Sequence, residues 1–298
     1  MSDVPTVSIG MPVYNAEEYL ASTIGAILAQ DFRDFELIIS DNASTDSSAE
    51  ICEGFARQDS RIRFVRQPRN RGATVNFRFV LDEARAPLFM WAAADDVRSP
   101  DFLTHTVAVL RRRPDVIAAN CRTRFDNGVF ERNRMGDGPI EHDDPAQRVL
   151  AFFGYWHANG RYYSLFRREA LLRNQALREE EYLASDWSIV LELLKLGKIT
   201  QADGGELILG SRGMSSRNLF RYYHRSVIDY VLPLWKFWRF TERLSATGFT
   251  PRQRFRLRTR VIGLNIEFVR WRLKQALRAN ATKSALSTAR PAGTGSHD

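Results

Sequence analysis

The sequence predicts an α/β fold with a mostly parallel sheet flanked by helices and a helical extension at its C-terminal end. Three observations support this prediction. Short apolar runs alternate with amphipathic segments of helical period over roughly the first 120 residues. Polar loops follow four of these runs, as in open sheets that bind ligands at the carboxyl ends of their strands. Two long helical patterns rich in arginine then occupy the last third of the chain.

The first half of the chain alternates strand and helix. Apolar runs predict strands at 6–11, 36–40, 62–66, 88–92 and 116–120. Apolar stripes predict helices at 17–30, 47–56, 73–84 and 100–112. Pro12 is expected to end the first strand, and Ser47 with Glu50 forms a capping-box pattern at the second helix. Strands joined by single helices favour right-handed crossovers and hence a parallel sheet.

The second half is less regular. We expect a long loop over 126–144, a helix over 145–153, and a strand over 163–166 followed by a helix from Arg168. A further helix begins at Asp186 and ends at Gly197, before strands at 198–202 and 206–209. Two long helices are predicted within 218–279, divided at 247–251, and the tail 280–298 is expected to be disordered.

This pattern predicts three regions along the chain. The first is an α/β region at 1–216, which the family resemblance described below makes a catalytic region with a nucleotide-binding part at about 1–121 and an acceptor part at about 122–216. A basic helical extension follows at 217–279, and the tail completes the chain.

Composition agrees with a globular protein of a reducing compartment. The 298 residues are 44% hydrophobic and 26% charged, so the chain can bury a large core without disulfides. Cys52 and Cys121 lie in apolar segments and are expected to be buried thiols. The first residues lack a signal-peptide pattern, and no run of eighteen apolar residues occurs, so a cytoplasmic location is expected.

The basic charge is concentrated in one region. Residues 212–278 carry 16 Lys and Arg against 3 Asp and Glu, which is +13, so the remainder of this +8 chain carries 8 − 13 = −5. Three interpretations of 217–279 are open. It can pack on the catalytic region or on a second copy in a homodimer, lie on an anionic membrane surface, or bind nucleic-acid phosphates. We favour the first two and expect no nucleic-acid partner.

Three acidic segments are candidate functional sites. Asp95 and Asp96 follow a strand, where either they hold a divalent cation or Asp96 or Ser99 caps the helix expected at Pro100. The loop 41–46 either binds a base or forms an Asx-rich turn before the next helix. Asp186 is either a helix N-cap or a general base for a hydroxyl group.

Taken together, these motifs resemble those of glycosyltransferase family 2, which has a Rossmann-like fold of the GT-A type. The resemblance rests on the opening segment 7–15, the loop 41–46, Asn70-Arg71-Gly72, Asp95-Asp96 and Ser185-Asp186. It covers residues from about 4 to 216. Each motif alone is weak, but five in this order are specific.

The resemblance implies an inverting transferase. It would move a sugar from a UDP or dTDP donor to an acceptor hydroxyl in cell-surface polysaccharide or glycolipid assembly, with GDP donors still open. A lipid-linked acceptor would place the protein in the cytoplasm, peripherally on the inner face of the cytoplasmic membrane. The resemblance also implies Mg²⁺ or Mn²⁺ as the cofactor.

The resemblance assigns roles to residues of this sequence. The catalytic base would be Asp186, and Asp95 with Asp96 would hold the metal ion. Nucleotide binding is assigned to Pro12, Tyr14, Asn15, Glu17, Asp41, Asn70, Arg71, Gly72 and Asp95. Arg212 is a candidate for phosphate binding, and Trp156, His157 and Asn159 are candidates for acceptor binding.

Departures from the family pattern keep alternatives open. Ala93 stands where the first Asp of a DXD motif is common, and Asn42 replaces a usual Asp. A non-catalytic glycan- or nucleotide-binding protein on a decayed transferase fold therefore remains the alternative. A sugar-nucleotide pyrophosphorylase is disfavoured, because 12–18 contains no Gly-rich phosphate loop.

Overall fold

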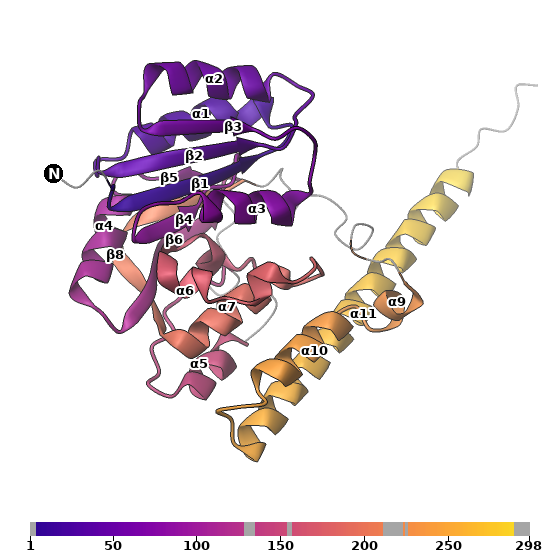
Figure 1. The fold of residues 1–298 in the computed structure, drawn as a ribbon. Helices are drawn as coiled ribbons and strands as arrows, with labels where there is room; N and C mark the ends of the chain where they lie inside the picture. Colours follow the sequence, from indigo (N-terminus) through magenta and orange to yellow (C-terminus); the bar gives the residue numbers. More distant parts are fainter. Residues whose placement is uncertain (1–3, 128–134, 154–156, 211–222, 224–225, 289–298) are drawn as a thin grey trace, which may run out of the picture.

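The structure is a computed structural model that describes residues 4–127, 135–153, 157–210, 223 and 226–288. Within these residues, strands form a mixed sheet in the order β3-β2-β1-β4-β7-β6-β8-β5, with helices on both faces (Figure 1). The predicted α/β fold with a C-terminal helical extension is confirmed. The strands are β1 Val7–Val13, β2 Phe35–Asp41, β3 Ile62–Arg66, β4 Leu88–Trp91, β5 Val97–Arg98, β6 Val116–Phe125, β7 Leu165–Arg167 and β8 Lys198–Leu209.

Helices cover the sheet and form the extension. The helices that cover the sheet are α1 Glu17–Leu28, α2 Ser48–Gln58, α3 Ala73–Asp82, α4 Phe102–Arg112, α5 Pro145–Phe152, α6 Arg168–Leu172 and α7 Ser185–Leu196. The extension contains α9 Val227–Val231, α10 Trp235–Leu244 and α11 Pro251–Thr288. Short 3₁₀ turns occur at Gly160–Tyr163 and Ala176–Arg178.

The sheet is mostly parallel, but the strand expected at 163–166, β7, is inserted between two other strands in a way that the alternation of elements did not predict. β1 pairs in parallel with β2 and β4, and β2 with β3. β7 lies between β4 and β6 and is antiparallel to both. β6 and β8 are parallel to each other, so the long segment between β6 and β8 returns once through the sheet.

Pro12 lies inside β1, contrary to the prediction that it ends the strand. Pairing of β1 with β4 stops at Gly10, whose carbonyl accepts the Ala92 N–H. Alternate residues of a strand face the same neighbour, so the nitrogen of Pro12 faces the side where β4 no longer pairs. Because proline has no N–H group and none is needed on that side, the sheet loses no hydrogen bond at Pro12. β1 therefore continues to Val13, which pairs with Asp41 of β2.

Several local predictions were wrong. The Ser47 side chain does not cap α2; instead the Asp46 carboxylate accepts the Ser48 N–H at 3.1 Å. The two strands expected within 198–209 are one strand, β8, which passes through Gly204 and Gly205. Gly205 has φ +82°, which a glycine adopts without strain.

The extension also differs from its prediction. The first expected helix is divided into α9 and α10, which are separated at 232–234 by a segment containing Pro233. The break at 247–251 is confirmed, since α11 begins at Pro251. The tail is helical as far as Thr288, because α11 continues past residue 280 where disorder was expected.

Two apolar clusters lie on opposite faces of the sheet. One joins the sheet to α1, α2 and α4, and the other joins it to α3 and α5–α7. The second cluster extends into α10 and α11: Phe237 lies 6.1 Å from both Phe153 and Trp187, measured between ring centroids. One face of the extension therefore packs on the catalytic region, as one of the open interpretations proposed.

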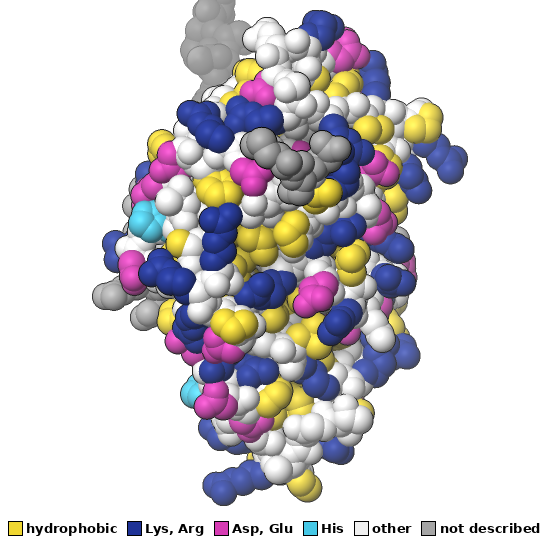
Figure 2. Space-filling model, turned by 60° about the vertical axis from the view of Figure 1, so that its left-hand side comes forward, with side chains coloured by type: hydrophobic (Ala, Val, Ile, Leu, Met, Phe, Trp, Pro, Cys, Tyr) yellow, Lys and Arg dark blue, Asp and Glu magenta, His cyan; other side chains and the backbone are white. Residues whose placement is uncertain are grey.

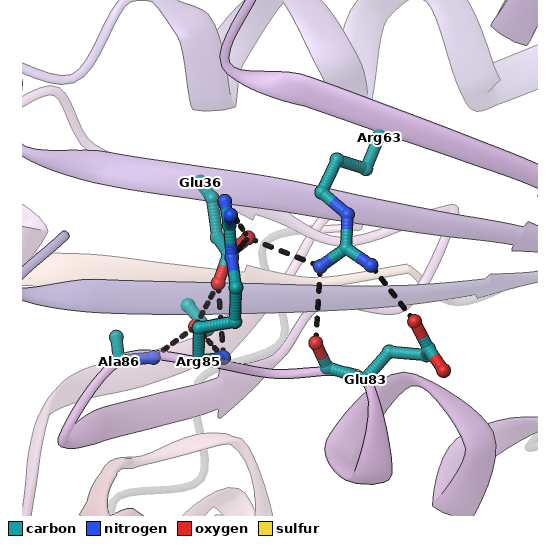
Figure 3. A network of polar contacts seen from close by, with 6 residues as sticks. Glu36, Arg63, Glu83, Arg85 and Ala86 are labelled. Carbon is teal, nitrogen blue, oxygen red and sulfur yellow. Dashed lines mark hydrogen bonds and ion pairs between the residues drawn. The ribbon is translucent and has the colours of Figure 1, made fainter. Parts of the chain in front are cut away.

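A buried carboxylate joins strands at the amino ends of the sheet, opposite the candidate site (Figure 3). Glu36 of β2 accepts hydrogen bonds from the Ser8 hydroxyl at 2.6 Å and from the Arg85 N–H at 3.0 Å. Its other oxygen accepts from the guanidinium groups of Arg85 and Arg63. Burial alone would raise the pKa of Glu36, but these hydrogen bonds outweigh burial and hold the pKa below its usual value.

Replacing Glu36 with glutamine should lower the free energy of unfolding by about 2–3 kcal/mol, because it breaks charged hydrogen bonds to two partly exposed arginines. Urea unfolding at pH 7 measures the change. The matched control is Glu53→Gln, which removes an exposed i,i+4 pair with Arg57 and should change stability by less than about 0.5 kcal/mol. Equal midpoints for the two variants would contradict a structural role for Glu36.

The surface of the molecule is mixed in charge where Figure 2 shows it. Lys and Arg side chains are interspersed with Asp and Glu side chains on that face (Figure 2). None of the helices in the described part of the chain combines the length and the apolar character needed to span a bilayer.

Candidate functional site

The loops after β1 and β2 are joined by hydrogen bonds at the carboxyl ends of the strands. The Asn15 N–H donates to the Ser44 hydroxyl at 2.9 Å, and the Asn15 side chain accepts the Thr45 N–H at 2.9 Å. Glu17 accepts the Ser47 N–H at 2.9 Å. Asn15 and Glu17 therefore hold the two loops together, beside the exposed ring of Tyr14.

Asp41 and Pro12 lie below these loops rather than at the surface. Both Asp41 oxygens accept the Ser44 N–H, at 3.2 and 3.3 Å, and the side chain is fully buried. The guanidinium of Arg66, about half exposed, lies 3.5 Å from Asp41. Contact between a base and Asp41 would therefore require the groups that enclose Asp41 to move.

The loop after β3 is held by Asn42. The Asn42 side chain accepts the Arg71 N–H at 2.9 Å and donates to the Asn70 side chain at 3.0 Å. The Gly72 carbonyl accepts from the same Asn42 amide, and Gly72 has φ +86°, which favours glycine. Asn70, Arg71 and Gly72 are thus brought beside the loop 41–46, as the sequence predicted.

Asp95 and Asp96 face different surroundings after β4. Asp95 is partly open to solvent, and burial followed by the charge of Asp126 raises its pKa. Asp96 is buried; its Oδ1 accepts the Gly210 N–H at 3.1 Å, and burial raises its pKa to about 7 against the charge of Arg98. Neither carboxylate is a helix cap, since α4 begins at Phe102 after Asp101.

Asp186 lies in the first turn of α7, two residues after its N-cap Ala184. Its Oδ2 accepts the Asn159 amide N–H at 2.9 Å. Burial raises the pKa of Asp186, although the hydrogen bonds from Asn159 and from backbone N–H groups lower it in part. The residue as a whole is partly exposed to solvent.

Two of the candidate acceptor residues, His157 and Asn159, are enclosed and do not line an open surface. Asn159 and His157 are buried, and the Asn159 N–H donates to His157 Nδ1 at 3.0 Å. The His157 ring stacks on Trp187, with ring centroids 4.3 Å apart. Burial lowers the pKa of His157 to about 3, so its imidazole is neutral near pH 7. Trp156 and Arg212 lie outside the described residues.

Tyr163 is a tyrosine of the site that sequence reasoning did not single out. Burial raises the pKa of its hydroxyl well above the usual value, and the charges of Asp96, Asp95 and Asp186 raise it further. The carboxylates at the end of β4 and at the start of α7 therefore all influence the pKa of one hydroxyl group.

Backbone strain gathers at the same edge of the sheet. Among the described residues, the non-glycine residues with positive φ are Asn15, Ala43, Asn159 and Ala184. Each belongs to a loop that carries a candidate site residue, and strain of this kind is common at functional sites.

The comparison with protein families agrees with this geometry. The model of the family described as glycosyl transferase family 2 matches residues 8–173, more than half of the chain. The chain belongs to glycosyl transferase family 2. The match includes β1 to β7 and all the candidate nucleotide-binding residues, and it ends before Asp186.

Curated relatives of this family 2 chain are longer than the region they share with it. "Glycosyltransferase GlyG" of Streptococcus pneumoniae is 30% identical over 115 residues, which is 38% of each chain. A "GalNAc(5)-diNAcBac-PP-undecaprenol beta-1,3-glucosyltransferase" of Campylobacter jejuni is 26% identical over 187 residues, 60% of this chain and 57% of the relative. The chain thus matches less than two thirds of the length of each.

Solved structures confirm the fold of this family 2 chain. TarS 1–349 of S. aureus in complex with UDP-GlcNAc has a TM-score of 0.63 at 16% identity, covering 84% of this chain and 69% of that one. The mannosyltransferase PcManGT of Pyrobaculum calidifontis, in complex with GDP-Man and Mn²⁺, has a TM-score of 0.61 at 19% identity, covering 98% and 77%. The GT-A fold expected from the sequence is therefore shown.

The donor set at Asp95 fits a divalent cation that arrives with a diphosphate. Within the described residues, no group of three or more His, Cys, Asp or Glu side chains could hold a metal ion alone. Mg²⁺ and Mn²⁺ commonly take one or two protein carboxylates and fill the other positions with phosphate and water. Gly210 leaves room beside Asp95, since a Cβ at this position would lie 2.4 Å from Asp95 Oδ2.

Sequence reasoning missed several polar residues of the site of this family 2 chain. Tyr163 was assigned only to a strand, and Asn42 only to a departure from the family pattern. Asn76 of α3 is buried and donates to the Ser40 carbonyl at 2.8 Å, which anchors α3 to the end of β2. A buried asparagine on the apolar face of a predicted helix was the only signal of that contact.

Proposed function

We propose that this protein is an inverting glycosyltransferase. It moves a sugar from a UDP or dTDP donor to an acceptor hydroxyl in the assembly of cell-surface polysaccharide or glycolipid. The observation that carries the proposal is the contact between the end of β4 and the turn beside Asp186: Trp91 of β4 stacks on Tyr162, with ring centroids 5.0 Å apart, and Asn159, which directly precedes that turn, holds Asp186. It supports a single site with a metal-binding carboxylate at one end and a proton acceptor at the other.

In this proposal Asp186 is the general base. Asn159 donates to its Oδ2 and holds the side chain in place, and the carboxylate accepts the proton of the acceptor hydroxyl. The acceptor oxygen forms a bond to the anomeric carbon as the bond from that carbon to the diphosphate oxygen breaks. The electron pair leaves with the diphosphate on the opposite side, so the configuration at the anomeric carbon inverts.

At the donor end, the proposal assigns Asp95 as the cation ligand, and Asp96 as the buried carboxylate that supports it through Gly210 and Arg98. A bound divalent cation supplies Lewis-acid stabilisation of the charge on the leaving diphosphate. Tyr14, Asn15 and the 70–72 loop are assigned to the nucleotide, because they form the exposed rim joined by Asn42 and Ser44.

The names of similar proteins support the choice of substrates. The TarS complex holds UDP-GlcNAc, which favours a uridine donor, and the Pyrobaculum complex holds GDP-Man, so guanosine donors belong in any test. The Campylobacter relative is named for an acceptor linked to undecaprenol diphosphate. We therefore propose a lipid-linked glycan acceptor and a place at the inner face of the cytoplasmic membrane.

A panel of nucleotide sugars tests the proposal. UDP, dTDP and GDP sugars are added with Mn²⁺ or with EDTA, and the melting temperature is measured, because a ligand of the folded state raises it in proportion to affinity. The sugar that binds is then incubated with the protein, and release of nucleoside diphosphate is followed. A metal-dependent shift with release supports the transferase; a shift without release under any acceptor condition supports a nucleotide-binding protein instead.

A further inference from the structure

The outer face of α11 carries an exposed apolar stripe. Phe255, Ile262, Ile266 and Leu273 are separated by seven, four and seven residues, so they lie on one side of a helix with about 3.6 residues per turn. Their side chains are 67%, 47%, 47% and 60% exposed. The opposite side of α11, with Leu257, Val261 and Leu264, is buried in the core shared with α10.

Cationic side chains line one flank of this stripe. By the helical repeat, the cationic residues on that flank are Arg252, Arg256, Arg260, Arg270 and Lys274, all exposed, and Glu267 lies among them. Within the described part of the chain, none of these five has a carboxylate at ion-pair distance. By contrast, Arg258 on the other flank pairs with Glu242 of α10. Glu267 is the single acidic residue of the chain between 251 and 274.

The helix α9 adds apolar surface on the other flank. Its large side chains are exposed, namely Val227, Ile228, Tyr230, Val231 and the following Leu232. The Arg272 guanidinium of α11 donates to the Tyr230 carbonyl and lies 5.1 Å from the centre of the Tyr230 ring. α9 is therefore fixed beside α11, as Figure 1 also shows. We call α9 together with the stripe and its cationic flank the arm face.

We infer that the arm face docks on the surface of an anionic lipid bilayer. Apolar side chains of a helix lying in the plane of a membrane enter the headgroup boundary, and flanking arginines meet anionic lipid headgroups. An exposed continuous apolar stripe is unusual on a protein that has no partner for it. The inference deepens the proposed function and rests on it in one respect: a lipid-linked acceptor would be met at that same surface.

Charge decides between the bilayer and other occupants of the arm face. A second copy of this chain would oppose the same arginines to one another, and like charges oppose close approach. A nucleic acid would neutralise the arginines but would offer no apolar surface to the stripe. An anionic bilayer complements both the apolar and the cationic parts.

Co-sedimentation with vesicles tests the inference. Vesicles of phosphatidylcholine alone are compared with vesicles that also contain phosphatidylglycerol. We expect the wild-type protein to sediment with the anionic vesicles, and less so as salt is raised. Phe255→Ser with Ile266→Ser should weaken partition at least ten-fold. Arg252→Gln with Arg256→Gln and Arg270→Gln should remove the preference for anionic lipid.

The matched control is Leu172→Ser with Leu196→Ser, which changes two exposed leucines at the ends of α6 and α7 and should leave partition unchanged. Wild-type protein that stays in the supernatant with anionic vesicles would overturn the inference. So would equal partition of the stripe and control variants. A stripe variant that lowers the mass of the lipid-free protein in sedimentation equilibrium would assign the arm face to a second copy.

Failure of the membrane-docking inference can be distinguished from failure of the proposed transferase function. Nucleoside diphosphate release is measured without lipid on the same preparations. Vesicle binding without donor turnover would leave the docking surface standing and reject the proposed function. Donor turnover by wild-type protein that ignores anionic vesicles would reject only the docking surface.

Discussion

Replacing Asp186 with asparagine is expected to slow sugar transfer by about 10²- to 10⁴-fold, the usual contribution of a general base. Donor binding should persist, because Asp186 lies in α7 and the nucleotide-binding loops follow β1 to β4. Burial raises the pKa of Asp186, so the substitution also removes a charge that is costly at neutral pH, and the variant should fold at least as stably. Single-turnover rates and donor-induced thermal shifts measure the two effects.

The pH profile identifies the base more specifically. The rate should fall as pH decreases through the raised pKa of Asp186, because the carboxylate must be ionised to accept a proton. Asn159→Ala removes a hydrogen bond that lowers this pKa, so the acid limb should move to higher pH. Glu181→Gln removes a charge that raises it, so the limb should move to lower pH. Limbs that stay in place in both variants would assign the base to another residue.

Replacing Asp95 with asparagine should abolish the Mn²⁺-dependent part of donor binding, a loss of at least ten-fold in affinity. Without ligand, the same variant should melt at the same or a higher temperature than the wild type at pH 7.5. The reason is that burial and Asp126 raise the pKa of Asp95, so this carboxyl contributes stability at low pH that is lost as pH rises through its folded pKa.

The loss of Mn²⁺-dependent donor binding together with an unchanged or higher melting temperature distinguishes a metal ligand from a residue that supports the fold. Thermal shifts with nucleotide sugar are recorded with Mn²⁺ and with EDTA for both proteins. Asp203→Asn changes an exposed carboxylate of β8 and serves as the control. An Asp95→Asn protein that melts lower without ligand and retains the full Mn²⁺ effect would show that Asp95 supports the fold and does not hold the cation.

Local patterns in the sequence predicted most elements of the sheet and its helices. Apolar runs and stripes of helical period depend on neighbours in the chain, and β2, β3, α4 and α7 lie close to their predicted bounds. The position of β7 could not be predicted in this way, because its pairing with β4 and β6 joins residues far apart in the sequence. The same holds for Pro12, whose place inside β1 depends on where β4 ends.

The candidate site was predicted only in part, because local motifs do not report contacts between residues that are far apart in the sequence. Motifs at strand ends placed Asp95 and the 70–72 loop at one edge of the sheet, because carboxyl ends of parallel strands meet there, and a helix-start motif placed Asp186 in the first turn of α7. Burial could not be read from the motifs: Asp41, Asp96 and His157 are enclosed, whereas Tyr14 is exposed. The contact of Asn159 with Asp186 joins two loops that no local pattern connects.

The aromatic packing of α10 has a consequence for shortened versions of the protein. Trp187 follows Asp186 directly in the chain, and Phe237 lies against it from the extension. Deleting the extension would leave Trp187 and Phe153 without this cover, beside the residue that we expect to take the proton. A truncated chain would therefore lose its lipid-binding surface and disturb its chemistry together, and only point substitutions on the outward side of α11 can separate the two.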